Sequence, residues 1–183
     1  AIGGTTRPNS SSEKALRIAA QAAKDAGAQV SFITGTDLLM PIYDTQCTER
    51  AVESVHLIEQ IRNADGVLIS SPGYHGGMSG LIKNAIDYLE DLSGDRRPYL
   101  DGRAVGCVAV AHGGQASVTT LHQLRHITHA LRGWPTPMGA AINIAETQFN
   151  TDGTLEDPAA NAALTRIGTQ IVDFAEAFTA YRN

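Results

Sequence analysis

Residues 103–117 read RAVGCVAVAHGGQAS, an apolar run that ends in a histidine, two glycines and a polar segment. The run from Arg103 to Ala111 predicts a strand buried on both faces, because its apolar residues do not alternate with polar ones. Similar short runs occupy residues 29–33, 66–71 and 136–145, and Ile2-Gly3 has the character of the end of a first strand. We therefore expect a sheet of five strands.

Amphipathic stretches lie between these runs and have recognisable ends. The segment Ser10–Glu13 has the spacing of a capping box and Gly27 is a typical helix stop, so we expect a helix over residues 10–26. Asp157 and Pro158 are the residue types that begin a helix. Strands that alternate with helices predict an α/β fold with a parallel sheet. The other expected helices span residues 48–63, 80–91 and 117–131.

Helical spacing also assigns individual side chains to buried or exposed faces. The apolar face expected for the second helix consists of Val52, Val55 and Ile58, and the face expected for the fourth consists of Val118, Leu121, Leu124 and Leu131. The third and fourth helices have more apolar and aromatic residues than a solvent face needs, among them Tyr88 and Leu92. This surplus favours association with further copies of the chain.

The composition fits one folded domain over residues 1–183, since 43% of the residues are hydrophobic and only 18% are charged. The net charge is 14 − 19 = −5, which provides no basic surface for nucleic acid. No apolar run approaches the roughly 20 residues that span a membrane. Cys47 and Cys107 lie in unlike contexts and no signal-peptide pattern follows Ala1, so we expect a cytoplasmic protein without disulfides, with Cys107 a small buried residue.

The segment after the first strand, residues 3–12, reads GGTTRPNSSS and leads directly into the first helix. Unpaired N–H groups and the positive dipole end at a helix N-terminus attract anions, and this loop adds hydroxyls and the guanidinium of Arg7. The combination predicts a phosphomonoester site. An alternative is that the serines only cap the helix while Arg7 lies in solvent. A P-loop and a dinucleotide fingerprint are disfavoured because their glycine and lysine patterns are missing.

Residues 71–87 read SPGYHGGMSGLIKNAID and follow the third strand. Glycines allow the main chain to lie against a flat ring, which Tyr74 and His75 can cover. The alternative is that Tyr74 buttresses the loop and His75 faces solvent. A general-base role for His75 ranks lower, because the sequence places no nucleophile and no orienting carboxylate beside it.

Two motifs in this segment resemble the NAD(P)H-dependent FMN reductases of the flavodoxin-like fold. They are Pro72-Gly73-Tyr74-His75-Gly76 and Leu81-Ile82-Lys83-Asn84-Ala85-Ile86-Asp87. The family patterns are Pro-x-Tyr-[Asn/His]-Gly and Leu-x-Lys-Asn-Ala-[Ile/Leu]-Asp. The resemblance runs from Gly3 to about Asn143 and includes residues 38–44. It implies a flavodoxin-like three-layer sandwich whose five-stranded parallel sheet has the order 2-1-3-4-5.

The resemblance also implies which residues hold FMN. The family's first loop binds the FMN phosphate, and threonine here replaces the commoner serine at one position. The residues implied for the phosphate are Thr5, Arg7, Ser10 and Ser12. The residues implied for the flavin ring in the second loop are Pro72, Gly73, Tyr74, His75 and Gly76.

The third loop, residues 111–117, reads AHGGQAS and follows the apolar fourth strand. Gly113 and Gly114 allow backbone N–H groups to approach the polar edge of a planar ligand, which suits the pyrimidine end of a flavin. The family is similar here but often has Ser or Thr in place of His112, which leaves the role of His112 open. The simpler alternative is a glycine turn before the next helix.

By this resemblance the protein is an enzyme, an NAD(P)H:FMN oxidoreductase that passes hydride from NADPH or NADH to FMN. Because the family usually associates, the resemblance also implies a homodimer or tetramer. The acceptor would be free flavin, a quinone, an azo compound, an oxyanion or a flavin-dependent monooxygenase. We expect no catalytic acid or base and no metal, with the N–H groups of Gly113 and Gly114 stabilising negative charge on the ring. The alternative is a flavodoxin-type electron carrier, for which a net charge of −5 is mild.

Two groups of charged or histidine residues lie outside these loops. His122, His126 and His129 recur at helical spacing, but no carboxylate or cysteine of that helix completes a metal site, so we expect them on a surface. The charged turn Asp95–Pro98 is expected to serve solubility. It would contact the 2′-phosphate of NADPH only if it overhung the site.

Overall fold

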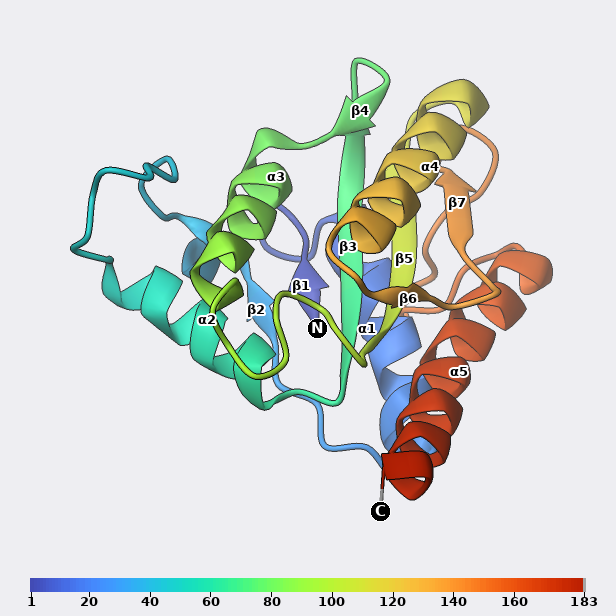
Figure 1. The fold of residues 1–183 in the computed structure, drawn as a ribbon. Helices are drawn as coiled ribbons and strands as arrows, with labels where there is room; N and C mark the ends of the chain where they lie inside the picture. The colour runs from blue at the N-terminus through green and yellow to red at the C-terminus, as the bar shows by residue number, and fades with distance from the viewer. Residues whose placement is uncertain (183) are drawn as a thin grey trace.

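A computed structural model describes residues 1–182, with a parallel sheet at its centre (Figure 1). The order is β2-β1-β3-β5-β6, and β7 also pairs with β5. β4 pairs only with β3, as an antiparallel hairpin. The observed order differs from the predicted 2-1-3-4-5 only in the numbering of the strands, because the hairpin adds β4 and the last strand is divided into β6 and β7. The predicted fold class is confirmed. The strands are β1 (Ile2–Gly3), β2 (Ile33–Thr34), β3 (Gly66–Tyr74), β4 (Gly77–Met78), β5 (Ala104–Ala111), β6 (Trp134–Pro135) and β7 (Ala140–Asn143).

Helices cover both faces of the sheet and complete the three layers (Figure 1). One face carries α1 (Ser11–Asp25) and α5 (Pro158–Arg182). The other face carries α2 (Val52–Asn63), α3 (Gly80–Asp87), α4 (Gly114–Ala130) and the 3-10 helices η1 (Gly35–Leu38) and η2 (Tyr88–Leu92). None of the described helices has the length and apolar character needed to cross a membrane.

The apolar run of β5 supplies both layers of the core, as its sequence predicts. Val105 and Cys107 pack toward α2, α3 and α4, whereas Val108 and Val110 pack toward α1 and α5. Gly106 has no side chain because a Cβ there would come within 2.4 Å of Ile167 in α5. The close packing of α5 against β5 therefore requires a residue without a side chain at position 106.

The predicted helix ends are confirmed where a side chain caps them. Ser10 Oγ accepts a hydrogen bond from the Glu13 N–H at 3.3 Å, at the start of α1. Asp157 Oδ1 accepts one from the Ala159 N–H at 2.8 Å, before α5. Such bonds satisfy first-turn N–H groups that no helical carbonyl reaches.

The expected faces of α2 and α4 are correct only in part, because Ile58 and Leu124 are buried as predicted. Val52, Val55 and Val118 are exposed, at 81%, 47% and 47%. α2 begins at Val52 instead of residue 48 and places Leu57, Ile58 and Ile61 over the core, beyond its first turn. The α4 face toward the core is centred on Leu124.

Tyr88 and Leu92 are core residues, so the expectation that they supply a surface for association is wrong. The helix predicted to residue 91 ends at Asp87 and tightens into η2. This turn directs both side chains inward, and the Tyr88 hydroxyl donates to the Pro41 carbonyl at 3.0 Å.

Two strands are shorter than predicted. Of residues 29–33, only Ile33 enters a strand, because β1 offers Ile2 and Gly3 as its pairing residues. The predicted run at 136–145 is divided between β6 and β7, with residues 136–139 between them.

Candidate functional site

The three loops singled out by the sequence meet at one edge of the sheet. Gly3 pairs with Ser70 and Pro72 pairs with Val110, so β1, β3 and β5 end side by side in parallel. The loops that follow them lie at the upper edge in Figure 1, around the β3–β4 hairpin. This is the carboxyl edge, where open α/β sheets bind ligands.

The loop after β1 contains two buried hydroxyls and one exposed cation. Ser10 and Ser12 are buried, with their Oγ atoms 3.3 Å apart. Thr5 Oγ1 accepts the Arg7 N–H at 3.1 Å, which shapes the turn before α1. The exposed Arg7 guanidinium has no hydrogen bond or ion pair with any residue from 1 to 182. A loop of this kind at a helix N-terminus can hold a phosphate group.

A buried carboxylate also belongs to this loop. Glu13 Oε2 accepts the Asn9 N–H at 3.0 Å, and Glu13 Oε1 pairs with Arg17 Nη2 at 2.7 Å. Asn9 has a left-handed φ of 54°, so the carboxylate holds a residue in an uncommon conformation. The capping-box pattern indicated Glu13 as a helix residue but not as part of the loop.

The hairpin between β3 and β4 explains the Tyr-His-Gly motif. Tyr74 pairs with Gly77 across a two-residue turn, in which His75 and Gly76 have φ values of 52° and 83°. Two positive φ values are those of a type I′ turn, which matches the twist of a hairpin. Tyr74 is 55% exposed, and its hydroxyl makes no hydrogen bond with the described residues. The turn thus presents Tyr74 and His75 at the tip.

Gly73 has a packing reason for being glycine. A Cβ at this position would lie 2.8 Å from Thr120 Oγ1 and 2.9 Å from the Ala111 Cβ. Thr120 is buried, and its Oγ1 has no hydrogen-bond partner among the described residues. The close approach of α4 to β3 therefore requires a glycine at position 73, whether or not a ligand contacts the backbone there.

The loop after β5 has open space around its glycines. A Cβ on Gly113 or Gly114 would meet nothing within 4 Å, and Gly113 has a φ of 130°. Neighbouring His112 is exposed. The space and the uncapped start of α4 at Gly114 allow a flat ligand to approach first-turn N–H groups.

Asn143, which sequence reasoning did not assign to the site, fixes this third loop. Its Oδ1 accepts the Gly113 N–H at 2.7 Å and the Ala145 N–H at 3.1 Å. The Gly113 N–H is therefore occupied, and the expectation that it stabilises charge on a ligand is wrong. An asparagine at the carboxyl end of an apolar strand was the available signal.

The second family motif ties α3 to the segment before α2. Asn84 Oδ1 accepts the Tyr43 N–H at 2.9 Å, and its Nδ2 donates to the Pro41 carbonyl at 2.9 Å. Arg50 binds both carboxylate oxygens of Asp91, at 2.7 and 2.8 Å. Asn84 is therefore a structural residue that holds the segment before α2 against α3, beside the three loops.

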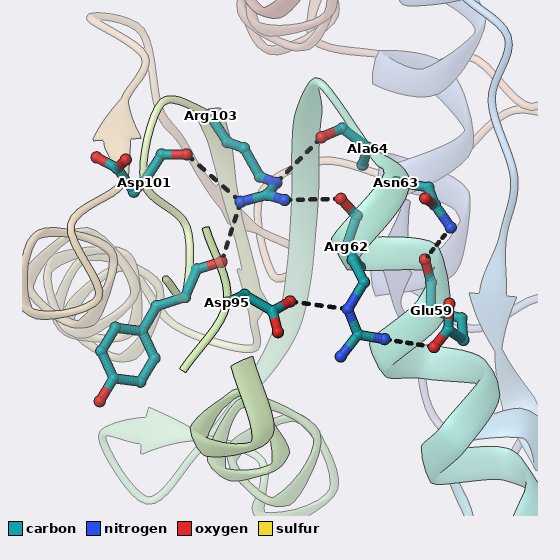
Figure 2. A network of polar contacts seen from close by, with 8 residues as sticks. Glu59, Arg62, Asn63, Ala64, Asp95, Asp101 and Arg103 are labelled. Carbon is teal, nitrogen blue, oxygen red and sulfur yellow. Dashed lines mark hydrogen bonds and ion pairs between the residues drawn. The ribbon is translucent and has the colours of Figure 1, made fainter. Parts of the chain in front are cut away.

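The charged turn Asp95–Pro98 lies at the opposite edge, so the suggested contact with NADPH is wrong. It precedes β5, whose first residue pairs with the first residue of β3. Figure 2 shows its neighbour Arg103, whose buried guanidinium donates to the main-chain carbonyls of Arg62, Ala64, Tyr99 and Asp101. Arg62 in turn pairs with Asp95 at 2.7 Å. Burial lowers the pKa of Arg103 to about 10.

The three histidines of α4 lie on its exposed surface. His122, His126 and His129 are exposed, as expected. Over residues 1–182, no three residues that bind metals are grouped closely enough to hold an ion.

Comparison with known proteins agrees with this geometry. Residues 1–147 match the family model described as NADPH-dependent FMN reductase. An NADPH azoreductase from Bacillus sp. (strain OY1-2) is 33% identical over 86 residues, which are 46% of this chain and 45% of that protein. An FMN-dependent NADPH-azoreductase from Staphylococcus aureus (strain USA300) is 33% identical over 98 residues, 54% of this chain and 48% of that protein. The chain thus spans about half the length of these curated relatives.

The fold also has a solved counterpart. The structure of the flavoenzyme NAD(P)H:(acceptor) oxidoreductase FerB from Paracoccus denitrificans superposes with a TM-score of 0.76 and 20% identity. The match covers 96% of this chain and 95% of that one. Because the family model matches most of the sequence, the chain belongs to the NADPH-dependent FMN reductase family.

Proposed function

We propose that the protein binds FMN at the three loops and uses NADPH or NADH to reduce a small acceptor through it. The observation that carries this proposal is the free Arg7 guanidinium at the N-terminus of α1, on the same sheet edge as the open glycine surface at Gly113 and Gly114. The Arg7 loop suits a phosphate group, and the surface at Gly113 and Gly114 suits a flat ring.

The phosphate would be held by Thr5, Arg7, Ser10 and Ser12. Ser10 and Ser12 supply hydroxyls at the first turn of α1, while Arg7 supplies the charge. Thr5 acts through the loop, since its Oγ1 is bonded to the Arg7 N–H. The buried hydroxyls are positioned before any ligand arrives, which lowers the entropy lost on binding.

The ring would lie between the β3–β4 hairpin and the start of α4. Tyr74 and His75 at the hairpin tip cover one side, and the backbone at Gly76 and Gly114 leaves room for the ring. When bound, FMN supplies the ring that accepts hydride from the nicotinamide. The first turn of α4 stabilises the negative charge that results, through its N–H groups and dipole. Pro72 and Gly73 complete the wall.

A reduction experiment tests this function against an electron carrier. The purified protein is loaded with FMN, and oxidation of NADPH and NADH is followed with and without added FMN. An enzyme oxidises the nicotinamide in many turnovers. Bound FMN that neither nicotinamide reduces would favour the flavodoxin-type carrier instead.

The acceptor is proposed from the relatives. Two similar proteins are named azoreductases, which supports an azo compound as one acceptor, beside free flavin, quinones and oxyanions. A flavin-dependent monooxygenase partner remains part of the proposal. Steady-state rates with one compound of each class rank them, and equal low rates with all four small classes would favour a protein partner.

We also propose self-association and a cytoplasmic location. Ile42 and Trp134 remain exposed, at 82% and 55%, and offer apolar contacts in place of Tyr88 and Leu92. Both cysteines are free thiols, which fits a reducing compartment. Sedimentation at micromolar concentration that shows only monomer would contradict the dimer or tetramer.

A further inference from the structure

The phosphate loop contains a negative charge as well as a positive one. The Glu13 side chain is only 7% exposed, and its carboxylate is bonded directly to the loop through the Asn9 N–H at 3.0 Å. Gly4 packs beside it, since a Cβ on Gly4 would lie 3.2 Å from the Glu13 Cβ. A phosphate held by this loop would therefore be close to a buried carboxylate.

Arg17 neutralises this carboxylate only in part. Arg17 Nη2 and Nε lie 2.7 and 3.0 Å from Glu13 Oε1, but the Arg17 side chain is 49% exposed. Water screens an exposed charge far more than a buried one. Arg17 also lies one helical turn beyond Glu13, on the side away from the start of the helix. At the loop, the negative charge of Glu13 is thus offset only in part by Arg17.

Glu13 also uses a donor that a phosphate needs. The Asn9 N–H is bonded to Glu13, the Glu13 N–H to Ser10 Oγ and the Arg7 N–H to Thr5 Oγ1. Anion sites at helix N-termini depend on free N–H groups, so each donor that the loop bonds to itself leaves one fewer for a phosphate.

We propose that Glu13 both shapes the phosphate loop and weakens its hold on the flavin phosphate, so that FMN exchanges with solution. The inference rests on the proposed function, because it concerns the phosphate end of the same site. Arg17 is the counter-charge that keeps this weakening moderate. The difference in affinity between FMN and riboflavin is therefore smaller than a loop with Arg7 but without Glu13 would give.

Two substitutions change the charge in opposite directions. Glu13→Gln keeps an oxygen that can accept the Asn9 N–H but removes the charge, so FMN should bind about tenfold more tightly, mainly through slower dissociation. Arg17→Gln leaves the carboxylate unpaired, so FMN should bind several-fold more weakly. Riboflavin, which has no phosphate, should bind both variants like the wild type. The effects on FMN should shrink as salt is raised.

Fluorescence titration with FMN and riboflavin, with stopped-flow dissociation, measures these effects on flavin-free protein. Thermal unfolding of each variant and a Glu13→Ala variant report the structural role, since alanine also loses the bond to Asn9. If Glu13→Gln binds FMN like the wild type, or if riboflavin shifts equally, the inference is overturned. If the wild type binds neither flavin, the proposed function itself fails, which is a different result.

Discussion

Thr120 and Gly73 are packed so closely that Thr120 Oγ1 lies 2.8 Å from the point where a Cβ on residue 73 would stand. The hydroxyl is buried and without a hydrogen-bond partner in the described chain. α4 and the end of β3 are therefore in direct contact behind the candidate site. Gly73 allows this close packing, whereas Gly114 leaves open space at the proposed ring site. Substitution of each glycine separates these two roles.

We expect Gly73→Ala to destabilise the protein by about 1–3 kcal/mol, because the added methyl group overpacks against Thr120. Gly114→Leu should change stability by less than about 1 kcal/mol, since no protein atom lies near its Cβ. It should nevertheless abolish FMN binding by filling the space proposed for the ring. Urea unfolding and flavin titration of both variants make the comparison. FMN bound normally by Gly114→Leu would contradict the placement of the ring.

Arg7→Ala should weaken FMN binding by about tenfold to a hundredfold, because a charge-assisted hydrogen bond to the phosphate is lost. Riboflavin is the control, since its binding should not change. Flavin fluorescence quenching gives both affinities. An unchanged affinity for FMN would remove the phosphate assignment.

His75→Asn should leave the hairpin folded, because asparagine also adopts the left-handed conformation that His75 has at φ 52°. Reduction of bound FMN should slow by no more than about tenfold, whereas loss of an obligatory acid or base slows a reaction by about a hundredfold or more. Single-turnover reduction by saturating NADPH measures this, with flavin occupancy checked. A thousandfold loss in a variant that retains FMN would show that His75 takes part in the chemistry.

Asn143→Asp keeps an oxygen that accepts the Gly113 and Ala145 N–H groups but places a negative charge beside the third loop. We expect FMN to bind and its reduction potential to fall on the order of 30 mV, which corresponds to a tenfold shift for a two-electron couple. Asn143→Leu should loosen the loop and weaken FMN binding. Dye-linked reduction measures the potential. An unchanged potential would place the ring away from Gly113.

Arg103→Met should destabilise the protein by about 2–4 kcal/mol, because four main-chain carbonyls lose their donors in a buried place. Arg103→Lys should rescue this only in part, since one ammonium group cannot match the planar guanidinium. Flavin affinity should stay unchanged in both, because the network lies at the opposite sheet edge. Chemical unfolding and flavin titration distinguish these effects, and a loss of FMN from a stable variant would contradict them.

The sequence by itself determined most of the helices and strands and the three loops that follow β1, β3 and β5. The unbroken apolar run of β5, the caps at Ser10 and Asp157 and the glycine pair at residues 113–114 were readable, because each depends on backbone geometry within a few residues. The parallel direction of the strands followed from the alternation of strands and helices, whereas their order was implied by the family resemblance. Together they brought three loops to one edge.

Only the tertiary structure decided what each polar group and glycine contacts. Asn143 reaches Gly113 across 30 residues, and Glu13 turns back to the loop that precedes its helix. Tyr88 faces the core because α3 gives way to a 3-10 turn. Such contacts depend on how the layers pack, because the partners are distant in sequence. A helix that ends one residue earlier or later also redirects the side chains that follow it.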